Sequence, residues 1–186
     1  HEAKYRETIA RLQDGAIGDI VCTRVFWNGA GVPVYPRRKG QTELEYQMRN
    51  WYYFNWLSGD HITEQFIHEI DVMNWHLGQN PKRAIGWGGR QRRISGDQYD
   101  FFSIEYVYEN GLRTHCAAPQ INGCSNPKVE QINGTARFAD ASGIIYDWKG
   151  NEIPHLRGRQ PSTHLGVVEE PLAVLHNADH DMAGVC

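Results

Sequence analysis

The order of apolar and polar positions predicts a helix and then a strand at the start of the chain. In residues 2–14, Tyr5, Ile9 and Leu12 share one face at helical spacing. Residues 20–27, IVCTRVFW, are rich in β-branched and aromatic side chains, which is typical of a strand. A glycine- and proline-containing loop is expected to follow this strand.

The most informative stretch runs from Trp51 to Leu77, where an aromatic run leads through a Ser-Gly-Asp break into a helical pattern. One helical stripe is apolar: Ile62, Phe66, Ile70, Met73 and Leu77. A second face is mostly polar: His61, Glu64, His68, Asp71 and Trp75. Asp60 is placed to cap this helix at its start, and Gly78 to end it. Two imidazoles and two carboxylates on one face indicate a role beyond scaffolding.

A run of short strand-like segments follows the helix. Residues 83–89 predict one strand. Residues 101–108 and 112–118 flank an Asn-Gly dipeptide, which between two strand patterns indicates a tight hairpin. Further short strands are expected at residues 129–132, 136–139 and 144–148.

These elements together predict an α+β fold, in which a largely antiparallel open sheet has helices packed on one face. We divide the chain into a domain of residues 1–157 and a C-terminal tail, residues 158–186, in which apolar positions set no long stripe. A sheet covered by helices on one face leaves its other face open. We therefore expect a partner subunit, in a homo-oligomer, to cover that second face.

Composition limits the classes of function. The net charge is −3 with a pI of about 6.3, which gives no basic footprint for nucleic acid. No apolar run approaches the length of a membrane span. The four cysteines show no CxxC spacing, so a zinc ribbon is not expected. The sequence begins at His1 within a helical pattern, from which we expect that an N-terminal part precedes it.

The polar helix face admits three interpretations. It could provide acid–base catalysis, since a carboxylate one turn from a histidine can orient the ring and stabilise its charged form. It could bind a metal, but His61 and His68 are seven residues apart, about 10 Å along a helix axis. No HExxH motif is present, so we expect no metal site here. The third interpretation is structural, with the polar groups satisfying backbone partners.

The segment before the helix adds aromatic rings beside polar donors: Arg49, Asn50, Trp51, Tyr52, Tyr53 and Trp56. This combination suits a carbohydrate, whose C–H faces pack on rings while its hydroxyls form hydrogen bonds. A packed core gives the same run of aromatics, so both readings stay open.

The segment SGDHITEQFIHEIDVMNWHLG, preceded by YRETIARLQDGAIGDIVCTRVFWN, resembles the C-terminal domain of the Gfo/Idh/MocA oxidoreductases. The resemblance covers about residues 1–148 and includes the later Ile-Asn-Gly-Thr turn. It implies hydride transfer between a sugar or polyol carbon and NAD or NADP. The cofactor would be bound mainly by an N-terminal Rossmann domain that this sequence lacks. The resemblance also implies an open sheet that serves as an oligomer interface.

The same resemblance assigns roles to individual residues. His68 would take the hydroxyl proton, Glu64 stands where many members have Asp, and Asp71 would support the histidine from behind. Substrate contacts would come from Arg49, Asn50, Trp51, Tyr52, Trp56 and His61. Without the Rossmann domain, the chain is expected to be inactive or nearly so.

Two other functions remain open from the sequence. One is a non-catalytic module that binds carbohydrate or assembles through its sheet. The other is a metal-dependent lyase or hydrolase that uses His61, Glu64 and His68.

Overall fold

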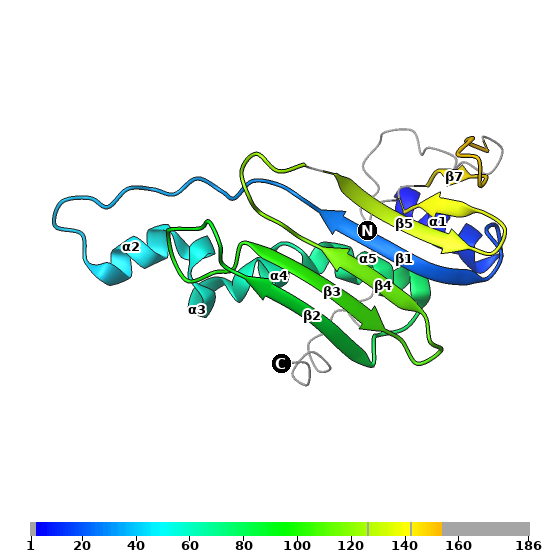
Figure 1. Cartoon of the computed structure of the whole chain (residues 1–186), viewed down its shortest axis with the longest axis horizontal. Helices are drawn as coiled ribbons and strands as arrows, with labels where there is room; N and C mark the ends of the chain where they lie inside the picture. The colour runs from blue at the N-terminus through cyan, green and yellow to red at the C-terminus, as the bar shows by residue number, and fades with distance from the viewer. Residues whose placement is uncertain (1–2, 126, 142, 154–186) are drawn as a thin grey trace.

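A seven-stranded open sheet forms the centre of the computed structural model, which describes residues 3–125, 127–141 and 143–153 (Figure 1). The strands are β1 (Ile20–Trp27), β2 (Arg83–Gly89), β3 (Phe101–Val107), β4 (Arg113–Ala117), β5 (Lys128–Gly134), β6 (Phe138–Asp140) and β7 (Ile145–Tyr146). Their order is β2-β3-β4-β1-β5-β6-β7, and the β1–β4 pair is parallel while the others are antiparallel. The predicted α+β fold with a largely antiparallel sheet is confirmed.

The helices are α1 (Ala3–Gln13), α2 (Glu43–Arg49), η1 (Trp51–Tyr53), α3 (Asn55–Ser58), α4 (Asp60–Glu64) and α5 (Ile67–Leu77). Helices α1 and α5 lie behind the sheet in Figure 1. The core between these helices and the sheet is built from Val25 and Ile132 of the central strands and from Phe66 and Met73 of the helical layer. Burial of these side chains is the main force that fixes the helices to one face.

Alternation along the strands leaves the second face of the sheet open. In β1, Thr23 and Val25 are buried against the helices, while Arg24 points to the other side. In β2, Ile85 and Trp87 are 52% and 67% exposed. The open face therefore carries both charged and large apolar side chains.

The long helix predicted from residue 61 to residue 77 is broken in two, so that prediction was wrong. The backbone N–H groups of Gln65 and Phe66 both donate to His61 O, at 3.1 and 2.9 Å, and α5 begins one residue later. Asp60 does not cap the helix as expected, because it has a positive φ of 70° and its carboxylate accepts from the next residue's N–H. Gly78 ends α5 in the left-handed conformation, as predicted.

An extended arm, residues 28–42, leads from β1 to α2 and projects from the sheet at the left of Figure 1. Helix α2 was not predicted, although Thr42 and Glu45 form a capping box at its start. No helix of the described residues is long and apolar enough to span a bilayer. The predicted tail, residues 158–186, lies outside the described residues.

Candidate functional site

A cavity of about 470 Å³ lies between the arm, η1 and the α4–α5 junction. Its wall contains six residues predicted from the sequence to serve the site: Arg49, Asn50, Trp51, Tyr52, Glu64 and His68. The structure also places Trp27, Tyr35, Tyr53, Gln65 and Glu69 in this wall. Aromatic rings and a small number of polar groups converge on a space large enough for a monosaccharide.

Glu64 and His68 reach the cavity from opposite sides of the helix break. Glu64 is the last residue of α4, and His68 lies in the first turn of α5. Within the described residues, neither side chain forms a hydrogen bond or an ion pair. Both groups are therefore available to a ligand in the cavity.

Tyr52 of the aromatic wall has a hydroxyl with two side-chain partners. Its side chain is 6% exposed, and its hydroxyl donates to Gln65 Oε1 at 3.0 Å and accepts from Gln120 Nε2 at 2.6 Å. Burial raises the pKa of this phenol. Tyr52 is thus held neutral and fixed in orientation, as a ligand-binding surface requires.

Asn50 and Arg49 join the arm to the end of α2. The Asn50 amide accepts from Tyr35 N at 2.8 Å and donates to Tyr35 O at 3.1 Å. The Arg49 guanidinium lies 4.8 Å from the Tyr35 ring centroid and donates to Pro36 O. Asn50 is buried, and its amide bonds both to the arm and to Tyr46 O of α2.

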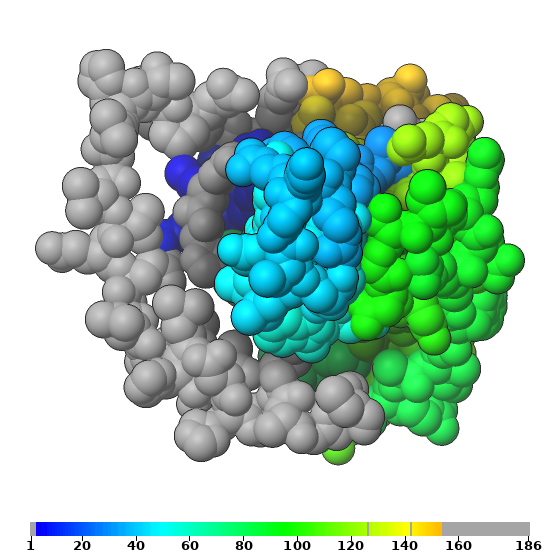
Figure 2. All heavy atoms as spheres, turned by 90° about the vertical axis from the view of Figure 1, so that its left-hand side faces the viewer, coloured from blue at the N-terminus to red at the C-terminus, as the bar shows by residue number. Residues whose placement is uncertain are grey.

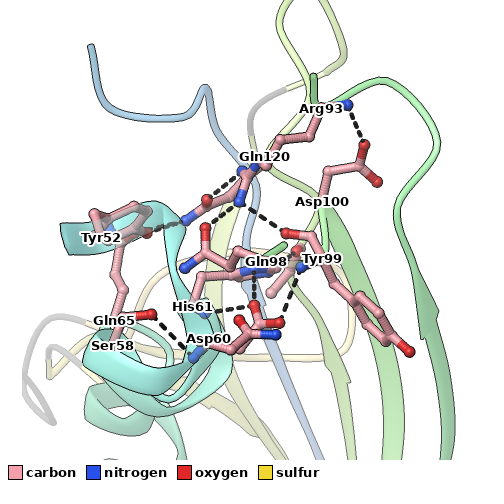
Figure 3. A network of polar contacts seen from close by, with 12 residues as sticks. Tyr52, Ser58, Asp60, His61, Gln65, Arg93, Gln98, Tyr99, Asp100 and Gln120 are labelled. Atoms are coloured by element: carbon pink, nitrogen blue, oxygen red, sulfur yellow. Dashed lines mark hydrogen bonds and ion pairs between the residues drawn. The ribbon is translucent and has the colours of Figure 1, made fainter. Parts of the chain in front are cut away.

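Three of the predicted site residues lie outside the cavity wall. His61 is 1% exposed and contacts Asp60 Oδ1 at 3.1 Å (Figure 3). Its Nε2 donates to Ala118 O at 2.8 Å, which holds α4 against the end of β4. Asp71 and Trp56 are exposed and do not line the cavity.

A polar network fixes α4 to the sheet, as Figure 3 shows. Asp60 Oδ2 accepts from Tyr99 N at 2.9 Å, just before β3. Gln120, after β4, donates to Gln65 Oε1 at 2.9 Å. These contacts join residues far apart in sequence. They hold α4, and with it Glu64 in the cavity wall, in place on the sheet.

Glu69 belongs to the cavity wall but was not predicted as a site residue. It is 4% exposed, and its Oε2 has no hydrogen-bond partner in the described structure. Burial, with a smaller contribution from Glu130, raises the pKa of this carboxyl to about 7. Its position three residues after Phe66 and four before Met73 on the apolar stripe was a signal of burial.

The described residues contain no group of three or more His, Cys, Asp or Glu side chains that could hold a metal ion.

Comparison with known families identifies the chain. The GFO/IDH/MocA C-terminal domain family matches residues 5–140. The chain belongs to this family. A comparison with curated proteins finds no match.

Solved structures share the fold of this GFO/IDH/MocA domain at low sequence identity. An aldose-aldose oxidoreductase from Caulobacter crescentus, complexed with glycerol, is 16% identical with a TM-score of 0.63, over 87% of this chain and 46% of that one. An NAD-binding protein from Listeria innocua is 16% identical with a TM-score of 0.53, over 80% and 37%. A super-repressor mutant of Gal80p from Saccharomyces cerevisiae is 17% identical with a TM-score of 0.62, over 98% and 48%. The chain thus spans about half the length of these proteins or less.

Proposed function

We propose that this domain is the substrate-binding part of an NAD(P)-dependent oxidoreductase that acts on a sugar or polyol. The observation that carries the proposal is the joint presence of Glu64 and His68 in one aromatic cavity, both without a hydrogen-bond partner among the residues that the structure describes. Membership of the family and the aldose-aldose oxidoreductase named among the similar structures support this class of substrate.

In this proposal, His68 accepts the proton of the substrate hydroxyl, for which imidazole is suited because it titrates near neutrality. Glu64 accepts hydrogen bonds from a neighbouring hydroxyl and favours the positive charge that His68 gains. Trp51 and Tyr52 pack on the C–H faces of the sugar. Nicotinamide supplies the acceptor for the hydride that leaves the same carbon.

The described residues do not form a cradle for a dinucleotide. A typical cradle is a glycine-rich turn between a strand and a helix N-terminus. Here β1 leads into the extended arm, and β4 leads into an irregular segment before β5. We therefore assign cofactor binding to a Rossmann domain outside this sequence, and we expect the chain alone to be inactive or nearly so.

Turnover by the complete protein, with the cofactor domain included, tests the role of His68. The reaction of NAD⁺ or NADP⁺ with a panel of sugars and polyols is followed by absorbance of the reduced nicotinamide. We expect His68→Ala to lower kcat by about a hundredfold or more, since loss of a general base has effects of this size. Glu109→Ala, at an exposed position in the turn between β3 and β4, is the control and should keep the activity. Equal turnover of His68→Ala and the parent would remove His68 from the mechanism.

A second candidate is a domain that binds a sugar without catalysis. The resemblance in fold to Gal80p, a protein described as having a super-repressor mutant, favours this possibility. Calorimetry of the 186-residue chain with sugars, without nicotinamide, tests it. Trp51→Ala should weaken binding by about tenfold, whereas Trp56→Ala, an exposed tryptophan outside the cavity, should not. Binding to the isolated chain together with an inactive complete protein would favour the second candidate.

A further inference from the structure

A second cavity, of about 580 Å³, adjoins the first and shares Val32, Pro33 and Tyr53 with it. It lies between the arm and the loop of residues 90–98 that follows β2. Figure 2 views this end of the molecule, with the arm drawn in blue to cyan and the region after β2 in green. Two arginines, Arg92 and Arg93, belong to its wall.

Arg93 is a half-buried cation, and among the described residues its guanidinium donates only to neutral acceptors. Its guanidinium donates to Tyr99 O and to Gln120 Oε1, each at 2.8 Å, and also to Gln98 Oε1. Its flat face lies 4.9 Å from the ring centroid of Tyr53. Among the described residues it forms no ion pair. Burial lowers the pKa of this guanidinium, but arginine keeps its charge in proteins.

Asp100 and Asp60 are the carboxylates that act electrostatically on the Arg93 guanidinium, and both already have other hydrogen-bond partners. Asp100 accepts the backbone N–H groups of Gln91, Arg92 and Arg93, with the shortest contact at 2.7 Å to Arg92. Asp60 accepts from His61 and Tyr99. Both carboxylates stabilise the charge of the Arg93 guanidinium through space, and neither forms an ion pair with it. A counter-ion in contact would stabilise this half-buried cation, so the Arg93 side of the cavity is suited to an anion.

Asp100 also belongs to this wall, but its carboxylate is already held by the backbone N–H groups of the loop. The other polar residues of the wall favour an anion. Arg92 adds a second cation, exposed and without an ion pair in the described part of the chain. Ser95 and Asn122 add a hydroxyl and an amide. Gly31 leaves space beside the Arg93 guanidinium for a ligand. A Cβ at this position would lie 2.8 Å from the Tyr53 hydroxyl and 3.5 Å from an Arg93 nitrogen.

We propose that the second cavity binds an anionic group, a carboxylate or a phosphate, between Arg92 and Arg93. Guanidinium groups bind both anions through paired N–H donors. This site is separate from Glu64 and His68, and it does not depend on the redox chemistry proposed above.

Titration of the 186-residue chain with inorganic phosphate and with acetate, at constant ionic strength, tests the site. Binding is followed by the NMR signals of the arginine Nε–H groups. We expect saturable shifts for Arg92 and Arg93. Arg92→Gln should weaken phosphate binding by about tenfold, the equivalent of one charge-assisted hydrogen bond. Arg83→Gln, an exposed arginine at the start of β2, is the matched control and should bind as the parent does.

Arg93 is tested with two variants, since its contacts also hold the loop. Arg93→Gln removes the charge, while Arg93→Lys keeps the charge and loses the planar fork. A thermal melt without added anion establishes that each variant is folded, and a folded Arg93→Lys should bind phosphate more weakly than the parent. The proposal is overturned if neither anion gives saturable shifts, or if Arg92→Gln and Arg83→Gln change the affinity equally.

The source of the anion follows from a further titration. Glucose 6-phosphate is compared with inorganic phosphate in the parent chain. Tighter binding of the sugar phosphate, weakened by Trp51→Ala, supports an anion that belongs to a ligand spanning both cavities. Equal binding of the two probes supports a site for a free anion.

Discussion

Glu69 is a buried glutamate with a strongly raised pKa. Its carboxyl lies between α5 and the sheet, near Cys116 of β4 and near Lys128 and Glu130 of β5. Burial has the largest effect and, with Glu130, opposes the charged form of the acid. The backbone N–H of Glu69 and, more weakly, Lys128 favour the charged form. Because Oε2 also lacks a hydrogen bond, ionisation of Glu69 costs folding free energy.

This cost gives stability a dependence on pH. The pKa of Glu69 is about 7 in the folded chain, against a reference of 4.5. Between these values the folded state binds more protons, so the free energy of unfolding falls as pH rises. Glu69→Gln should remove this loss and raise the free energy of unfolding near pH 8 by up to about 3 kcal/mol.

Urea unfolding of parent and variant, near pH 4 and near pH 8, measures the effect. Glu109→Gln, at an exposed glutamate, should leave the pH dependence unchanged. The raised pKa of Glu69 would be contradicted if the free energy of unfolding of the parent were the same near pH 4 and near pH 8. It would also be contradicted if Glu69→Gln kept the pH dependence of the parent.

At the scale of elements, the strands could be predicted from sequence and the helix break could not. The strands follow from local alternation and from the Asn-Gly turn. The break at Gln65 and Phe66 is set by partners far along the chain, since Gln120 binds Gln65 across 55 residues. Glu64 and His68 line the cavity on either side of this break, whereas His61, in the same short helix as Glu64, is buried against Ala118 O. Helix periodicity alone did not separate the buried His61 from the two cavity residues.

Another long-range contact places the loop that carries Arg92 and Arg93. At Gly96 the backbone has a φ of +69°, and a Cβ would lie 1.9 Å from Tyr53 O. The same carbonyl accepts the N–H groups of Asp97 and Gln98, at 3.0 and 3.3 Å. Only glycine allows this close approach between the loop and η1.

Gly96→Ala should therefore destabilise the chain by about 2–3 kcal/mol, from backbone strain and weakened hydrogen bonds. Gly111→Ala is the matched control, since its φ is +84° and a Cβ there would meet nothing within 4 Å. We expect it to lose only about 1 kcal/mol. Chemical denaturation measures both variants, and equal losses would show that the contact with Tyr53 contributes nothing.

At the scale of the whole molecule, one face of the sheet carries none of the described helices. We propose that it forms the interface of a homo-oligomer. Trp87 and Ile85 of β2 expose much of their apolar surface on it, and Phe26 of β1 and His115 of β4 meet edge to face at its centre. A two-layer fold with such a face has a ready surface for a second copy.

Trp87→Arg should dissociate this assembly, because the charge would be buried without a partner when two sheets pack together. Sedimentation velocity of the 186-residue chain should show the parent as an oligomer and Trp87→Arg as a monomer, or an affinity between subunits lowered by at least about tenfold. Trp56→Arg changes an equally exposed tryptophan, 61% against 67%, on α3 and away from the open face. It should assemble as the parent does. If the sheet face is the interface, only Trp87→Arg places a charge between the subunits. A monomeric parent, or dissociation by Trp56→Arg alone, would therefore show that the sheet face is not the interface.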